Sequence, residues 1–235
     1  MTLKTLVNAA QDLLSLPRSS TVVASTDTNV RLLLQVANEE GRVLARSYTW
    51  EAITKEKTFT SVAQAVQTGA IESDFNRLVP GSMFNRSQQR RITGPLSSSE
   101  WQAQQSLSTA LLTDAFRIRG GDILITPTPE AGDTYGYEYV SNNWCQSGAS
   151  VEQTAWAADA DTGLLDESLM LLGVIWRYRK ARGFDYAEEM TTYEAEKAQA
   201  QMRDGGGKRT LNYGKDTSLY DHAKEPLVIE GSWNL

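Results

Sequence analysis

Apolar residues near the start of the chain recur at intervals of three and four, the spacing of one face of an α-helix. They run from Leu3 to Leu14, and Pro17 interrupts the pattern soon afterwards. Proline has no backbone N–H to donate and clashes with the preceding turn, so it ends a helix. The pattern therefore predicts a short amphipathic helix over 3–15.

A second helical stripe follows a polar stretch of serines and threonines. It predicts a helix from about 28 to 46, with Asp27 or Thr28 in the N-cap position. Gly41 falls inside this helix, where glycine costs about 1 kcal/mol of helix propensity relative to alanine. We therefore expect Gly41 to mark a bend or break in an N-terminal helical region over 1–47.

From Tyr48 onward the helical period gives way to short runs rich in β-branched and aromatic residues, separated by turn residues. The clearest of these is 116–125, where two alternating runs flank Gly120 and Gly121 and predict a β-hairpin. Short strands at this spacing are typical of sandwiches and barrels. We expect an antiparallel β domain of six or seven strands over 48–158.

One strand of this region places three tyrosines, Tyr135, Tyr137 and Tyr139, on the same face, with Trp144 shortly after them. An exposed aromatic row stacks on sugars, and this indicates a carbohydrate-binding β module as one alternative function. Alternation with small and polar residues is more typical of a strand whose aromatic face is buried in a core. The pattern favours the buried interpretation.

Helical spacing resumes over 162–182 and 185–202. Asp185 followed by Glu188 matches a capping box at the start of the second of these helices. The two helices are predicted to form an αα-hairpin over 159–203 that packs against the N-terminal helices. The apolar stripe that we expect to join the pair consists of Leu169, Leu172, Trp176, Met190 and Tyr193.

No periodicity continues beyond three consecutive glycines, and residues 204–235 are interpreted as an extended tail. Apolar side chains are spaced along it, and the run from Leu227 to Ile229 is typical of a short strand that adds to the sheet edge of a partner. As a hypothesis, the tail docks on a partner protein through Leu211, Tyr213, Tyr220, Leu227, Val228, Ile229 and Trp233.

Composition places the chain among globular proteins: 235 residues, 40% of them hydrophobic and 22% charged. Together with the order of the elements, this predicts an α+β fold, a helical bundle with an inserted antiparallel β domain and an extended C-terminal tail. The net charge of −6 disfavours non-specific binding of nucleic acid. We expect no secretory signal, because Asn8, Gln11 and Asp12 interrupt the apolar residues near the start, and no membrane-spanning segment, because no run of eighteen apolar residues occurs.

Candidate chemistry is sparse. The single histidine, His222, lies in the tail, and the run GGGKRT at 205–210 lacks the spacing of a phosphate-binding loop. Asp159 and Asp161 begin like a calcium loop, but Met170 stands where the bidentate glutamate belongs. The lone cysteine excludes a cysteine metal site. We therefore expect no catalytic residue, no metal and no cofactor.

Several segments, taken in order, resemble the head-to-tail adaptor family of short-tailed bacteriophages, which includes tail tubular protein A. The resemblance covers most of the chain and depends on the order of the segments more than on any one of them. They read RSYTWEAITKEKTFTSVA, ESDFNRLVPGSMFNRS, GPLSSSEWQAQ, FRIRGGDILITPTP, YGYEYVSNNWC and DESLMLLGVIWRYRKARGFDYAEEMTTYEAEKAQAQ.

This resemblance implies a structural virion protein without catalysis, assembled in the bacterial cytoplasm. The family arrangement is a twelve-subunit ring below the portal, with a channel for double-stranded DNA and a lower face that receives the tail or nozzle. A ring subunit needs rigid helices for packing against its neighbours and an extension that reaches a partner. The alternative within the virion is another joining protein, a stopper or a tail terminator.

Overall fold

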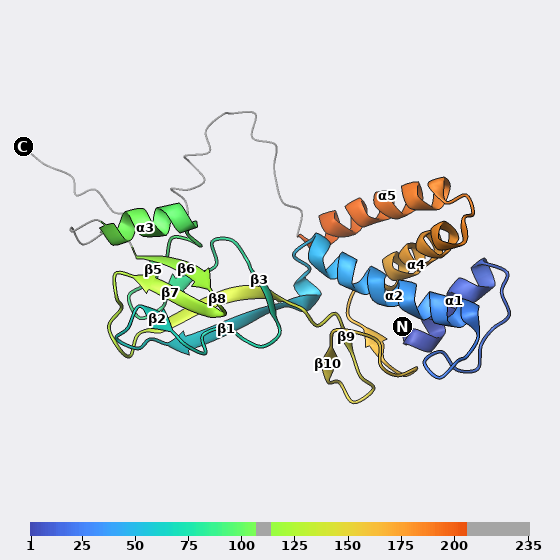
Figure 1. Ribbon diagram of the computed structural model, residues 1–235, viewed down its shortest axis with the longest axis horizontal. Helices are drawn as coiled ribbons and strands as arrows, with labels where there is room; N and C mark the ends of the chain where they lie inside the picture. The colour runs from blue at the N-terminus through green and yellow to red at the C-terminus, as the bar shows by residue number, and fades with distance from the viewer. Residues whose placement is uncertain (107–113, 206–235) are drawn as a thin grey trace, which may run out of the picture.

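The computed structural model describes residues 1–106 and 114–205, which form two bodies at the two ends of an elongated molecule (Figure 1). Helices from both ends of the chain make one body, called the helical body below. Most of the strands encoded between them make the other, called the β body. This confirms the α+β prediction. The helices are α1 (Leu3–Leu13), α2 (Thr28–Ser47), α3 (Ser98–Ser106), α4 (Glu167–Arg182) and α5 (Ala187–Asp204), with a 3₁₀ turn, η1, at Glu51–Ile53.

The strands of the described residues form three antiparallel sheets. The largest has the order β1-β8-β4-β5, with β3 also paired to β8; the other two have the orders β2-β7-β6 and β10-β9-β11. The strands are β1 (Thr54–Thr60), β2 (Val66–Gln67), β3 (Phe75–Leu78), β4 (Phe84–Asn85), β5 (Arg90–Arg91), β6 (Ala115–Arg119), β7 (Asp122–Thr126), β8 (Thr134–Ser141), β9 (Cys145–Gln146), β10 (Glu152–Gln153) and β11 (Thr162–Gly163).

Local capping explains where α2 begins and where α4 begins and ends. Asp27 caps α2 by accepting a hydrogen bond from the Asn29 backbone N–H at 2.6 Å. Asp166 caps α4 through the Leu169 N–H at 2.9 Å, and α4 ends at Gly183 in a left-handed conformation with φ 74°. Polar oxygens satisfy the first N–H groups of a helix, and glycine tolerates the positive φ that terminates it.

α4 begins five residues later than the pattern predicts, because residues 162–163 form strand β11 instead of a first helical turn. Asp161 is hydrogen-bonded within this turn: its Oδ2 accepts from the Ala157 and Ala158 backbone N–H groups at 2.7 and 2.8 Å. Asp159 similarly accepts from Val22 at 3.0 Å and ties the α1–α2 loop to this segment. The two acids that resemble a calcium loop are thus hydrogen-bonded to backbone.

The predicted capping box of α5 is wrong. The helix begins at Ala187 with Tyr186 as its N-cap residue, and no side chain caps it. The Asp185 carboxylate accepts a hydrogen bond from the Ala187 N–H at 3.2 Å, but it lies one residue too early to reach the N–H groups further inside the helix.

The tyrosine row of β8 is buried in the core of the β body. Tyr135, Tyr137 and Tyr139 are 1%, 1% and 3% exposed, and the Tyr137 hydroxyl donates to the Ala70 carbonyl at 2.7 Å. Phe59 on β1 stacks on Tyr135 with ring centroids 5.4 Å apart. The same core includes Ile123 and other residues of the β2-β7-β6 sheet, so the two sheets enclose it as a sandwich does. The buried interpretation of the row is confirmed.

The small β10-β9-β11 sheet belongs to the helical core rather than to the β body. Trp144, Cys145 and Trp156 are buried together with the apolar faces of α1, α2 and α4. The two indole rings meet edge to face at 5.2 Å. The packing therefore places residues 144–158 with the helices, although periodicity alone assigns them to the β domain over 48–158.

Gly41 does not break α2, which runs without interruption through it. Its missing side chain makes room for Trp144, because a Cβ at this position would overlap the edge of the indole ring. Glycine is thus needed here for close packing between the helix and the third sheet.

We expect Gly41→Ala to lower the free energy of unfolding by about 1–3 kcal/mol, the usual cost of overpacking a core. Helix propensity alone predicts the opposite sign, a gain of about 1 kcal/mol. Urea unfolding distinguishes the two. Gly148→Ala is the control, because the nearest side-chain atom to a Cβ there is 3.7 Å away. A Gly41→Ala protein as stable as the original would contradict the packing role.

Candidate functional site

The α4–α5 hairpin lies on α2 and supplies most of the predicted packing residues. Leu169, Trp176 and Tyr193 are 0%, 7% and 2% exposed, and Leu172 packs partly buried against the same core. The inward assignment of Met190 is wrong, since this residue is 40% exposed.

Met190 is exposed because the inward face of α5 is centred one position away from it. Glu189 lies on that face, half-buried, and pairs with Arg179 of α4 at 2.8 Å. Tyr193 and Ala200 continue the face and are the two buried residues of the helix. A glutamate at an inward position is not expected from an apolar pattern, and only the facing arginine accounts for it.

A buried carboxylate, which the sequence reasoning missed, joins three helices. Glu40 of α2 is 0% exposed; its carboxylate accepts hydrogen bonds from Arg177 Nε of α4 at 2.5 Å and from the Tyr193 hydroxyl of α5 at 2.6 Å. Burial, and then the charge and hydrogen bond of Glu40, raise the pKa of Tyr193. Gly173 is required beside them, because a Cβ there would overlap the Glu40 carboxylate. The set Glu40, Arg177 and Tyr193 is called the three-helix cluster below.

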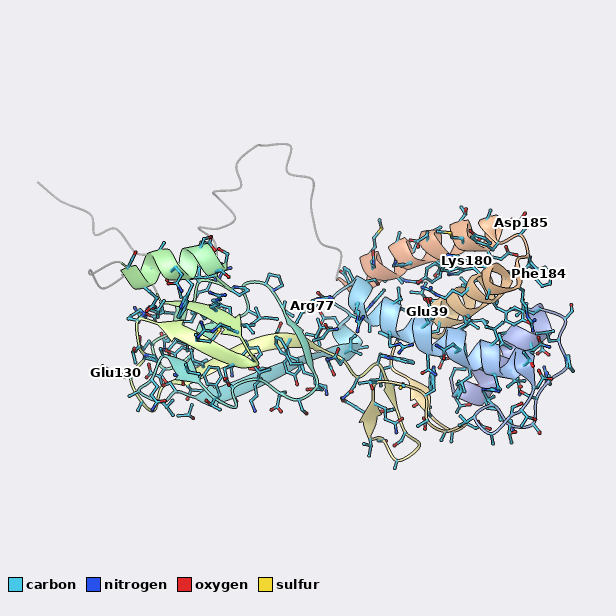
Figure 2. All side chains as sticks on the ribbon, viewed as in Figure 1. Glu39, Arg77, Glu130, Lys180, Phe184 and Asp185 are labelled. Atoms are coloured by element: carbon cyan, nitrogen blue, oxygen red, sulfur yellow. The ribbon has the colours of Figure 1, made fainter. Side chains whose placement is uncertain are left out.

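The outer tip of the helical body carries positive charge and an exposed aromatic ring. Lys180 and Arg182 are exposed in the last turn of α4, and Phe184 is 60% exposed just beyond it. Figure 2 shows Phe184 and Asp185 at the end of the molecule farthest from the β body. The tip is therefore available to a partner.

The C-terminal end of α5 is attached at the junction between the two bodies. Asp204 accepts a hydrogen bond from the Glu51 backbone N–H of η1 at 2.9 Å. Gly205 lies so close to Tyr48 that a Cβ would overlap the tyrosine hydroxyl. The point from which the predicted tail departs is thus fixed. The tail residues Leu211, Tyr213, Tyr220, Leu227, Val228, Ile229 and Trp233, like His222, lie outside the described residues.

A polar network links the β body to the third sheet at the same junction. Lys55 of β1 pairs with Asp74 at 2.8 Å and with Glu152 of β10. Asp74 also accepts from the Tyr139 hydroxyl at 2.9 Å and from Ser141 Oγ at 2.8 Å. Burial alone raises the pKa of Asp74, but these hydrogen bonds and the Lys55 charge together lower it below its ordinary value.

Because its pKa is lowered in the folded state, the Asp74 carboxylate stabilises the fold at pH values above the pKa that it has in the unfolded chain. This contribution is lost as the pH falls through the folded-state pKa. We therefore expect the free energy of unfolding to decrease below about pH 4, the ordinary aspartate range. Denaturant titrations at pH 7 and pH 3 measure it. Asp74→Asn should be less stable at pH 7 and lose less on acidification; an equal loss in both proteins would contradict this role.

Within 1–106 and 114–205, no group of three or more histidine, cysteine, aspartate or glutamate side chains is placed to hold a metal ion. Among the helices of the same residues, none is both long enough and apolar enough to cross a membrane. The polar clusters of this part of the chain, the three-helix cluster and the Lys55–Asp74 network, instead connect elements of the fold.

Comparison with known proteins gives the family. No curated protein matches the chain. The SU10 adaptor protein family matches residues 1–218, which include both bodies and the beginning of the predicted tail. This agrees with the resemblance drawn from the order of the sequence segments. The chain therefore belongs to the SU10 adaptor protein family, a family of phage head-to-tail adaptors.

Proposed function

We propose that this protein joins the portal of a phage capsid to the tail or nozzle as a ring of identical subunits, twelve in the family arrangement, with DNA passing through its channel. Family membership itself makes it a structural phage adaptor rather than an enzyme, with portal and tail as general partners. The match over residues 1–218 is the observation that carries the proposal.

The two bodies support a connecting role because each has its own core. One cluster of buried side chains fills the helical body and a second fills the β body, and they are joined at Trp50 and η1. A connector must present separate surfaces to the layers above and below it and to its neighbours in a ring. A net charge of −6 is also compatible with a channel along which DNA slides without sticking.

We propose in addition that the tail after Gly205 docks on the portal. Residues 206–235, fully extended at about 3.3 Å each, have a reach of roughly 100 Å. Leu227 to Ile229 would add as a strand to a partner sheet, where main-chain hydrogen bonds supply affinity and side-chain pockets supply specificity. The anchoring of Asp204 and Gly205 at the junction supports this arrangement, because it fixes the origin of the tail.

A protein that ends at Gly205 should fold but bind portal much more weakly, since it keeps every contact of the described helices and loses all the proposed anchors. Unfolding curves and pull-down by isolated portal measure the two properties. Trp233→Ala should weaken portal binding by about 2 kcal/mol or more if the ring fills a pocket. Full portal affinity in the truncated protein would assign docking to the helical body instead.

The alternative within the virion is a stopper or tail terminator, which joins other layers. Immobilised portal and immobilised tail tube, tested separately with the full chain, distinguish the functions. We expect capture by portal, and capture by tail tube alone would favour the terminator. A carbohydrate-binding function loses its basis, because the tyrosine row that suggested it is buried.

A further inference from the structure

A groove of about 370 Å³ lies at the junction of the two bodies. Its walls come from the last turns of α2, the segment around β3, and the connection between β8 and β9. The residues that matter here are Arg42, Arg46, Asp74, Asn76, Asn142 and Trp144, and we call the space between them the junction groove. The Lys55–Asp74 network described above lies beside it.

Two polar N–H groups at the walls of the groove are buried without an acceptor in the described part of the chain. They are the Asn76 side-chain Nδ2 and the Trp144 indole Nε1. Trp144 is 1% exposed, so water in the surrounding solvent does not satisfy it. Buried donors without partners are unfavourable and uncommon in native proteins. Both groups can only donate, and because solvent does not reach either atom, an acceptor that satisfies them has to come with a movement of the atoms that cover them.

The groove also carries uncompensated positive charge. Arg42 and Arg46 are exposed, and neither forms an ion pair with any residue in 1–106 or 114–205. A third guanidinium adjoins them, since Arg77 donates to the Arg46 carbonyl at 2.9 Å and lies between the two bodies in Figure 2. The one acid in the lining, Asp74, is already paired with Lys55.

We propose that the junction groove binds a carboxylate side chain on an acidic segment of a partner polypeptide. Guanidinium groups recognise carboxylates through charge-assisted hydrogen bonds. A phosphate of DNA is the less suitable occupant, because the acidic chain as a whole disfavours a polyanion.

The inference rests on the proposed function only in taking the partner to be a protein. A small peptide mimic can be tested on the free protein, without portal, tail or ring formation. Failure of the mimic to bind would therefore remove this inference and leave the adaptor role untouched, and failure of portal binding would do the reverse.

The probe is N-acetyl-L-glutamate N-methylamide, titrated into the isotope-labelled full chain and followed by nuclear magnetic resonance. We expect saturable shifts in the Trp144 indole N–H and Asn76 side-chain amide signals. The matched neutral probe, N-acetyl-L-glutamine N-methylamide, should bind at least about tenfold more weakly, since charge-assisted hydrogen bonds are about twice as strong as neutral ones.

Arg46→Gln should likewise weaken binding of the acidic probe about tenfold, because one guanidinium is lost. Arg31→Gln is the control: Arg31 is also exposed on α2 but does not line the groove. Both sites are at the surface, so both proteins should fold, and thermal unfolding checks this. Equal binding of the neutral probe, no shift at Trp144, or equally tight binding of inorganic phosphate at the same signals would each overturn the proposal.

Discussion

Glu40→Ala should lower the free energy of unfolding by about 3–5 kcal/mol, the range observed when one member of a buried ion pair is removed. The substitution leaves the Tyr193 hydroxyl without its acceptor and Arg177, whose side chain is 14% exposed, without its buried partner. Three helices share this carboxylate, so we also expect α5 to lose protection from amide hydrogen exchange before the rest of the helical body.

The adjacent residue provides a matched control, because Glu39 binds the same arginine at 3.0 Å but is 53% exposed. Glu39→Gln should cost no more than about 1 kcal/mol, as is usual for surface ion pairs. Denaturant unfolding of the two variants, measured side by side, separates the effect of burying the carboxylate from the effect of pairing it with Arg177. Similar losses in both would mean that the three-helix cluster has no special role in holding α5.

Trp176→Ala is the second large expected effect, a loss of about 3–5 kcal/mol, as for other truncations of large aromatic residues in a core. The indole lies 6.0 Å from the Tyr193 ring and 6.2 Å from the Tyr186 ring, and the Arg177 guanidinium lies over it at 4.6 Å. Its removal would open a cavity between α4 and α5. Chemical denaturation measures the loss.

Met190→Ala, on the exposed face of α5, should change the stability by no more than about 0.5 kcal/mol. If Trp176→Ala instead keeps the original stability and only assembly with the portal fails, Trp176 acts at an interface between proteins. That result would contradict its place in the helical core.

Local features of the fold could be predicted because each depends on residues close together in the chain. Asp27 caps α2 through its own first turn, and the alternation around Gly120 and Gly121 needs only two adjacent strands. The burial of Tyr135 to Tyr139 follows from their alternation along one strand. Periodicity and capping chemistry are sufficient for such elements.

The features that could not be predicted depend on partners far away in the sequence. Gly41 meets Trp144, and Glu40 meets Arg177 and Tyr193, across more than a hundred residues. One signal for Glu40 is present in the sequence, since it interrupts the apolar positions Leu33, Ala37 and Leu44 on the inward face of α2. A charge at that position indicates a buried partner but does not identify it.

The unpartnered donors of the junction groove are likewise invisible in the sequence. Asn76 and Trp144 come from separate elements, and nothing in their neighbouring residues shows that each lacks an acceptor. Only the arrangement of the two bodies brings them beside Arg42 and Arg46. Satisfaction of buried polar groups is a property of the folded chain and has to be counted there.

The most direct test of the adaptor role is native mass spectrometry of the protein alone and after mixing with the isolated portal. We expect one complex that carries one adaptor subunit for each portal subunit, twelve on a twelve-subunit portal. Portal and adaptor that keep their separate masses, even at concentrations well above the dissociation constants of stable protein–protein contacts, would contradict the proposed function.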